Sequence, residues 1–170
     1  VTMSLGIRLA VEEFIKAAKE FCEISDRIHN GWQLYMNNTE EHKTFIKKET
    51  FINHCLNGID SLFKAEYIIF YNLSFGVPSF SFNVWDSTGA LLTLEDIRQM
   101  SFITIKKEDF YSVITQQEHP VILRPYFIMH PCHTPLLLAN FKDISKNIIV
   151  TFLGLITPLL RLNLPLEYGM

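Results

Sequence analysis

The sequence predicts a single α+β domain with an N-terminal helix, an antiparallel sheet of about four or more strands, and helices towards the C-terminus. An apolar stripe at helical spacing comes first, and several runs of alternating apolar residues follow without helices between them. A mainly apolar segment then occupies residues 148–160. Strands that are grouped rather than alternating with helices are typical of α+β architectures. The 170 residues suit one domain spanning 1–170.

The composition is that of a packed globule. Hydrophobic residues make up 48% of the chain, charged residues 19%, and the net charge is −3, which argues against disorder and against a nucleic-acid groove. The apolar run 148–160 is shorter than the about 20 residues that a membrane helix needs. The start of the chain has no secretory pattern, and three cysteines at wide spacings form no disulfide framework. We therefore expect a soluble cytoplasmic protein without stable membrane insertion.

The first helix is predicted over residues 7–28. Its apolar positions recur at spacings of three and four, with one gap, which is the pattern of one buried helix face. Asn30-Gly31 then ends the helix. Cys22 lies beside the stripe, where we expect it to pack as a small apolar side chain, and we expect the same of Cys55. The stripe consists of Ile7, Val11, Phe14, Ala18, Phe21 and Ile28.

Short β-type runs follow. Residues 32–36 and 43–52 read as strands, and the mixed composition of the region 32–52 suggests an edge open to strand addition by a partner. In the segment 66–75, apolar side chains alternate until Gly76 breaks the run, and the next run, 79–86, is predicted to be its antiparallel neighbour. The alternating face of the segment 66–75 consists of Tyr67, Ile69, Tyr71, Leu73 and Phe75.

The second half of the chain is less regular. A helix is predicted over 93–100, because Thr93 can cap it and Asp96 follows three residues later. Residues 114–120 read as a loop that leads to an edge strand over 125–129. A last helix is predicted to begin near Ser145 and to carry the apolar run 148–160.

Residues 130–133 read His-Pro-Cys-His, directly after the predicted strand 125–129. Three interpretations of Cys132 stand open: a packed structural thiol, a metal ligand, or a reactive sulfur. Metal sites usually contain close cysteine pairs such as Cys-x-x-Cys, which the sequence lacks, so we expect neither a metal nor a cofactor. Loops that follow strands often present reactive groups, and neighbouring imidazoles favour a thiolate. For His130, a structural role in the turn competes with a role as general base.

The motifs ITQQEHP at 114–120, PYFIMHPCHT at 125–134 and LNLPLEYG at 162–169 resemble one family of conjugating enzymes. The runs EYIIFYNLSFGVPSFSF and LLTLEDI extend the likeness, which covers most of residues 60–169. The family is the autophagy-related protein ten family of ubiquitin-like-conjugating enzymes, whose sister family, autophagy-related protein three, shares the His-Pro-Cys triplet. The resemblance implies a ubiquitin-conjugating-enzyme-like fold.

The resemblance also implies an activity. Cys132 would accept the ubiquitin-like modifier autophagy protein twelve as a thioester from the activating enzyme autophagy protein seven. The modifier would then pass to a lysine of autophagy protein five. Three alternatives stay open: the sister enzyme that lipidates autophagy protein eight, a non-catalytic interaction module of the same fold, and a cysteine hydrolase that uses a neighbouring histidine as base.

Ubiquitin-conjugating enzymes proper carry an asparagine in the place that Cys132 takes in the His-Pro-Cys triplet, so another group must stabilise the oxyanion. The sequence offers hydrogen-bonding side chains in two segments as candidates. His119-Pro120 reads as a turn or as part of an acceptor groove. Apolar side chains near the sulfur would favour a neutral lysine amine, and Phe127, Leu136 and Leu137 are expected there. The candidate donors and orienting groups are Tyr71, Asn72, Thr115, Gln116 and Gln117.

Overall fold

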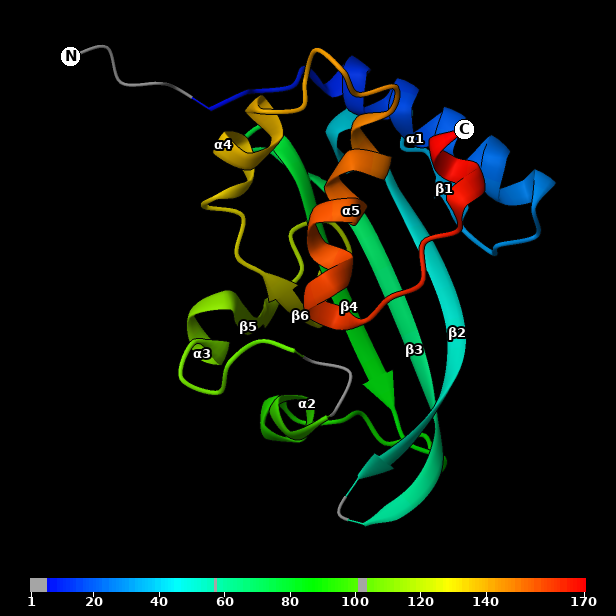
Figure 1. The fold of residues 1–170 in the computed structure, drawn as a ribbon, viewed down its shortest axis with the longest axis vertical. Helices are drawn as coiled ribbons and strands as arrows, with labels where there is room; N and C mark the ends of the chain where they lie inside the picture. Colours follow the sequence, from blue (N-terminus) through cyan, green and yellow to red (C-terminus); the bar gives the residue numbers. More distant parts are fainter. Residues whose placement is uncertain (1–5, 57, 101–103) are drawn as a thin grey trace.

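The computed structural model describes residues 6–56, 58–100 and 104–170, which form a sheet covered by helices on one face (Figure 1). The order of the six described strands is β1-β2-β3-β4-β6-β5, and every pairing is antiparallel. The predicted α+β class is confirmed. The helices are α1 (Val11–Arg27), α2 (Leu94–Gln99), α3 (Phe110–Val113), α4 (Thr134–Ala139) and α5 (Ile148–Leu160), with 3-10 turns η1 (Glu41–Lys43) and η2 (Leu166–Gly169). The strands are β1 (Gln33–Tyr35), β2 (Phe45–Leu56), β3 (Ile59–Asn72), β4 (Val77–Trp85), β5 (Ile114–Glu118) and β6 (Pro125–Met129).

Helix α1 buries the predicted stripe but begins later than predicted. Phe14, Ala18 and Phe21 are completely buried, and Cys22 packs beside them as expected. The prediction that the helix includes Ile7 is wrong. Residues 6–10 are extended, because their backbone pairs with other parts of the chain instead of forming helical hydrogen bonds.

The sheet separates two apolar clusters. The larger one lies between the sheet and helices α1 and α5, and it contains Phe80, Phe82 and Phe127. The smaller one lies on the opposite face and consists of Ile68, Phe70, Tyr126 and Ile128. Because side chains alternate along β3 and β6, each of these two strands contributes to both clusters.

Three predictions about strands need correction. The segment 66–75 was expected to be strand throughout, but β3 ends at Asn72, and Leu73 and Phe75 are exposed in the turn to β4. Residues 114–118, predicted to be a loop, form the edge strand β5. Strand β6 is therefore an inner strand between β4 and β5, and not an edge strand.

Strands β2 and β3 form a long hairpin whose far end leaves the core. Leu56 pairs with Ile59 across a two-residue connection that contains Gly58, whose φ is +78°. Cys55 is exposed on this hairpin, so the prediction that it packs in the interior is wrong. Strand β1 pairs only with residues 45–47 of β2, which leaves the outer side of residues 48–56 without a neighbouring strand among the described residues. It overlaps the region 32–52, where an edge open to strand addition was predicted, at residues 48–52, and strand addition by a partner stays a prediction.

Helix α5 begins at Ile148 rather than near Ser145, because the side chain of Asn147 caps it by accepting from the N–H groups of Ile149 and Val150. After α5, the chain crosses over β3 and β2 towards α1 (Figure 1). There the Tyr168 ring stacks on Phe21, with 4.4 Å between ring centroids. No helix of the described residues is both long and apolar enough for a membrane span.

Candidate functional site

Cys132 lies on the loop that joins β6 to α4. Strand β6 ends at Met129, and Pro131 offers no N–H to extend the ladder, so the chain turns out of the sheet. The thiol is exposed and is not part of a disulfide. Residue 133 then caps α4, with the His133 carbonyl accepting from the N–H of Leu137. The sulfur is thus presented at a fixed point between a strand and a helix.

His130 shapes this loop through its ring. Its Nδ1 accepts the N–H of Cys132 at 3.2 Å, so the neutral ring carries its proton on Nε2. The backbone N–H of His130 donates to the Val113 carbonyl at 2.8 Å, and the Phe75 ring stands edge-on to the imidazole. This hydrogen bond gives the His130 ring a structural part in the turn, one of the two roles considered for it. Because the Nδ1 lone pair is occupied, Nδ1 is not available as a general base.

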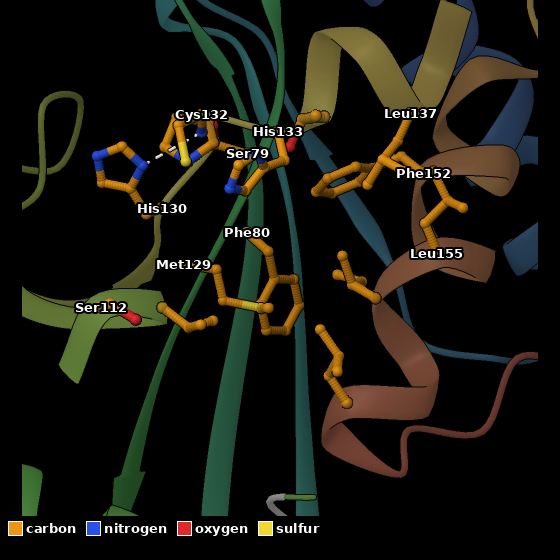
Figure 2. A pocket seen from close by; sticks show the side chains of 15 residues that line it. Ser79, Phe80, Ser112, Met129, His130, Cys132, His133, Leu137, Phe152 and Leu155 are labelled. Atoms are coloured by element: carbon orange, nitrogen blue, oxygen red, sulfur yellow. Dashed lines mark hydrogen bonds between the residues drawn. The ribbon is translucent and has the colours of Figure 1, made fainter. Parts of the chain in front are cut away.

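A cavity of about 380 Å³ opens beside Cys132 (Figure 2). Ser79, Cys132 and His133 lie at one end of it, and Phe80 and Met129 form its floor. Helix α5 forms the facing wall. Apart from the residues already named, the lining consists of Ser112, Val113, His130, Pro131, Thr134, Leu137, Phe152, Leu155, Ile156 and Leu159.

Of the three apolar residues predicted near the sulfur, the structure brings only Leu137 into the lining of this cavity. Phe127 is completely buried in the main core beside Phe82, so the hypothesis fails for it. Leu136 is half-exposed and does not line the cavity. The local environment is nevertheless apolar, because α5 supplies side chains that the sequence did not place there.

The extended segment 6–10 ties the surroundings of Cys132 together. The N–H of Ile7 donates to the Pro135 carbonyl at the start of α4, and the N–H of Leu9 donates to the Gly76 carbonyl in the β3–β4 turn. The guanidinium of Arg8 donates to two further carbonyls of that turn. Gly6 touches α4 so closely that a Cβ would lie 2.5 Å from the Pro135 Cβ.

Tyr71 and Asn72 lie at the end of β3, outside the cavity lining. The Tyr71 hydroxyl donates to the Leu9 carbonyl at 2.6 Å and is buried, so it holds the segment 6–10 in place. The Asn72 Oδ1 accepts the N–H of Phe75 and shapes the turn that places Phe75 against His130. Tyr71 and Asn72 therefore act on the Cys132 loop indirectly, Tyr71 through the segment 6–10 and Asn72 through Phe75.

Thr115, Gln116 and Gln117 lie on edge strand β5, and none lines the cavity. Gln116 pairs with Phe127, which is three residues, or about 10 Å, before His130 along β6. Thr115 and Gln117 point to the opposite face, since they alternate with it. The structure does not bring these side chains together with the sulfur.

His119 is a turn element, one of the two roles considered for it. It is completely buried against Phe70 and Tyr126. Its Nδ1 accepts the N–H groups of Val121 and Ile122, and its Nε2 lies 3.0 Å from the Ser81 hydroxyl. Burial lowers the pKa of the imidazole to about 4, so the ring is neutral and donates from Nε2.

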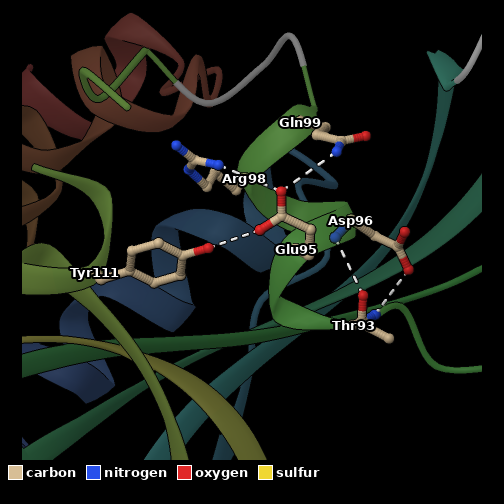
Figure 3. A network of polar contacts seen from close by, with 6 residues as sticks. All are labelled: Thr93, Glu95, Asp96, Arg98, Gln99 and Tyr111. Atoms are coloured by element: carbon tan, nitrogen blue, oxygen red, sulfur yellow. Dashed lines mark hydrogen bonds and ion pairs between the residues drawn. The ribbon is translucent and has the colours of Figure 1, made fainter. Parts of the chain in front are cut away.

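A polar network joins helices α2 and α3 (Figure 3). Thr93 and Asp96 form the predicted capping box at the start of α2. The carboxylate of Glu95 accepts from the Tyr111 hydroxyl at 2.6 Å and from Arg98 at 3.3 Å. These hydrogen bonds lower the pKa of Glu95 below its ordinary value, with the Tyr111 bond as the main cause. The network fixes α3, which carries Ser112 and Val113 into the cavity wall.

Sequence reasoning missed the cavity wall and one polar group within it. Ser79 is buried, and its hydroxyl has no hydrogen-bond partner among the described residues. The apolar pattern of α5 indicated a buried helix but not which strand residues it would face. Phe75 was expected in a strand, and only the β3–β4 turn brings it beside His130.

The chain is an α+β domain with helices on one face of an antiparallel sheet, and its exposed Cys132 lies beside a cavity at the end of β6. The fold resembles the autophagic E2 Atg10, described in a crystal structure, with a TM-score of 0.57. The superposition covers 91% of this chain and 98% of that one, at 14% sequence identity, and therefore shows the fold.

Residues 13–167 match the family described as autophagocytosis associated protein, active-site domain, and the chain belongs to this family. The human ubiquitin-like-conjugating enzyme ATG10 is 36% identical over 115 residues, covering 62% of this chain and 52% of the human protein. The Arabidopsis thaliana enzyme of the same name is 26% identical over 137 residues, covering 72% and 61%. The chain spans between half and two thirds of the length of these relatives.

Proposed function

We propose that the chain is the catalytic domain, over residues 1–170, of an E2-like conjugating enzyme that acts in autophagy in the cytoplasm. Cys132 carries a ubiquitin-like modifier as a thioester. The observation that carries this proposal is an exposed, unbridged thiol held between β6 and α4 at the open end of a cavity. Family membership and the names of the relatives support it.

The chemistry consists of two acyl transfers. The Cys132 thiolate attacks the thioester carbonyl of the modifier on the activating enzyme, whose cysteine leaves as a thiolate. A neutral lysine amine of the acceptor then attacks the new thioester, an amide bond forms, and the Cys132 thiolate leaves while the amine loses its proton. The apolar surroundings of Leu137, Leu155 and Leu159 favour the neutral amine over the ammonium ion.

The partners follow from the family resemblance. We assign autophagy protein twelve as the modifier, autophagy protein seven as the activating enzyme and autophagy protein five as the acceptor. Both relatives described above carry the name ATG10, and this name supports the assignment over the sister enzyme that lipidates autophagy protein eight.

Five residues are considered as the oxyanion donor. Asn72 is placed best of the sequence candidates, because no described residue accepts from its Nδ2 and its turn abuts His130. Ser79 lines the cavity with an unpartnered hydroxyl. Tyr71 is engaged with Leu9, while Thr115 and Gln116 remain candidates at a greater distance. Alanine at the donor position slows discharge of a preformed thioester to lysine and leaves loading unchanged.

A loading assay tests the proposal. The chain is incubated with autophagy protein seven, autophagy protein twelve and ATP, and the products are separated with and without reducing agent. A thiol-sensitive adduct is expected, and Cys132→Ser should convert it to a thiol-resistant oxyester or abolish it. Cys55→Ser is the matched control, because Cys55 is also exposed and unbridged, and this variant should load normally.

The same assay separates the alternatives. If the parent chain and the Cys55→Ser variant are both folded and neither forms an adduct, the protein is an interaction module. Loading with autophagy protein eight in place of autophagy protein twelve indicates the sister activity. A hydrolase releases free modifier without the activating enzyme.

A further inference from the structure

A second pocket lies on the other side of α5 from the Cys132 cavity. It has a volume of about 240 Å³ and is lined by residues of β2, β3, the end of α5 and the segment that follows α5. It shares no lining residue with the Cys132 cavity. The lining consists of Trp32, Lys48, Thr50, Ile52, Tyr67, Leu153, Thr157, Arg161, Leu162, Asn163 and Leu164.

Lys48 points into this pocket from the core-facing side of β2. It alternates with Lys47 and follows Ile46, which is completely buried on the same face. Its aliphatic stem lies beside Gly31. No carboxylate within the described ranges pairs with it, and burial lowers the pKa of its ammonium group. Partly buried charges are normally paired, so an unpaired one calls for an explanation.

Arg161 supplies a second cation. It follows the last residue of α5 and has a left-handed backbone with φ of +48°, which turns the chain across the sheet. It makes no ion pair or side-chain hydrogen bond to any residue that the structure describes. The pocket contains no acidic side chain in its described lining. Arg161 is exposed and Lys48 is partly buried, and both line this pocket, so an anion bound there would meet positive charge from β2 and from the end of α5.

Neutral hydrogen-bond donors complete the lining. Tyr67 stands directly opposite Lys48 in the β2–β3 register, and burial raises the pKa of its phenol to about 12, so it stays a donor. Thr50, Thr157 and Asn163 add further hydroxyl and amide groups. Cations and neutral hydrogen-bond donors are the groups that bind phosphate and carboxylate oxygens.

We propose that this pocket binds a compact oxyanion, a phosphate or carboxylate group, between Lys48 and Arg161. The volume accommodates such a group with part of the molecule that carries it. Trp32 and Tyr67 supply apolar ring surface for that part. The site stands apart from Cys132 chemistry and does not depend on the proposed conjugating function.

The test is a titration of the isotope-labelled chain, followed by amide resonances in nuclear magnetic resonance spectra. Inorganic phosphate is added in one arm and acetate in the other, with ionic strength held constant by chloride. We expect saturable shifts for amides of residues 48–52 and 161–164. Saturation by phosphate alone identifies a phosphate ligand, by acetate alone a carboxylate, and by both a general oxyanion site.

Two variants probe the cations. Lys48→Gln removes one charge and should weaken binding about tenfold, the usual effect of losing a charged hydrogen bond. Arg161→Asn should act similarly, and asparagine tolerates the left-handed backbone. Lys19→Gln on the exposed side of α1 is the control. The proposal is overturned if neither anion gives saturable shifts, or if Lys19→Gln weakens binding as much as the pocket variants do.

Discussion

At the scale of single residues, the two His-Pro pairs of the chain form turns that are closed by the same kind of hydrogen bond. His119 and His130 each precede a proline, so the next available N–H belongs to the residue two positions later. In both turns the ring Nδ1 accepts that N–H, from Val121 in one and Cys132 in the other. A ring nitrogen therefore closes each turn in place of a backbone carbonyl. One turn is buried and supports the small apolar cluster, and the other presents the thiol.

The role of His130 in positioning Cys132 gives a prediction. His130→Ala removes the acceptor for the Cys132 N–H and should slow thioester formation several-fold, about the effect of one hydrogen bond worth ~1 kcal/mol. His130→Asn should restore most of the rate, because its Oδ1 can accept the same N–H. Single-turnover loading measures both variants. If His130 acted as a base instead, Asn would not rescue and the pH profile would lose a titrating group.

His119 predicts a pH dependence of stability. Its folded pKa of about 4 lies below the usual 6.5, so the native state favours the neutral ring. The contribution of the neutral His119 ring to the free energy of unfolding is fully present above pH 6.5. It is lost as the pH falls towards 4, by up to about 3 kcal/mol. Urea unfolding at pH 7 and pH 5 measures it. His119→Asn should be less stable at pH 7 but should lose less stability on acidification; an unchanged pH slope would contradict the assignment.

The place of Cys132 on a loop after a strand was predictable from sequence, but its neighbours in space were not. His-Pro-Cys after an apolar strand indicates a thiol on a loop, and the structure places it there. Ser79 and Phe75 carry no local signal, because their positions near the site arise from turns and from packing between distant segments. Tyr71 was selected as a hydroxyl in a suitable strand, yet its bond to Leu9 depends on a segment 62 residues away.

At the scale of elements, α2 and α3 act as a support for the cavity wall. The Thr93 capping box satisfies two N–H groups at the start of α2, and Glu95 then connects α2 to Tyr111 on α3 (Figure 3). The capping box could be predicted from the sequence because its two residues, Thr93 and Asp96, are only three positions apart. The link to Tyr111 joins residues 16 apart and could not be predicted.

Removing the cap should be measurable. Thr93→Ala should destabilise the protein by about 1 kcal/mol, while Thr93→Ser keeps a hydroxyl and should cost only a few tenths. Urea unfolding compares the two. Equal losses for alanine and serine would show that the methyl group of Thr93, and not its hydroxyl, matters.

The sequence pattern failed to predict elements in two situations: strands that contain mostly polar residues, and strands whose apolar side chains are exposed to solvent. β5 reads Ile-Thr-Gln-Gln-Glu, and as an edge strand it needs only Ile114 to face the core. The far end of the β2–β3 hairpin exposes Phe51 and Leu62, so alternation there does not mark burial. The Asn57-Gly58 dipeptide was a usable signal for a tight hairpin connection.

At the scale of the whole molecule, the extended segment 6–10 connects α4 with the β3–β4 turn, on both sides of the Cys132 loop. Sequence alone predicted the architecture from grouped strands, but it assigned this segment to a helix. Ile7 fits the helical spacing, and only the contacts with Pro135 and Gly76 explain why the helix begins later. The cavity likewise forms only when α5 packs over β4 and β6.

The close contact of Gly6 predicts a long-range effect. Gly6→Ala places a Cβ 2.5 Å from the Pro135 Cβ and 2.6 Å from its carbonyl carbon, which should displace the segment from α4. We expect faster amide hydrogen exchange in residues 132–138 and slower loading. Gly154→Ala is the control, because a Cβ there meets no atom within 4 Å, and it should stabilise α5 by about 1 kcal/mol.

The Tyr168 ring stacks on Phe21, and its hydroxyl donates to the side chain of Asn30 at 2.8 Å. These contacts determine how the protein tolerates changes near residue 170. Removing residues 166–170 would uncover the buried ring of Phe21 on α1, so we expect the protein to aggregate. An affinity tag added after Met170, whose side chain is exposed, should leave the contacts of Tyr168 with Phe21 and Asn30 intact.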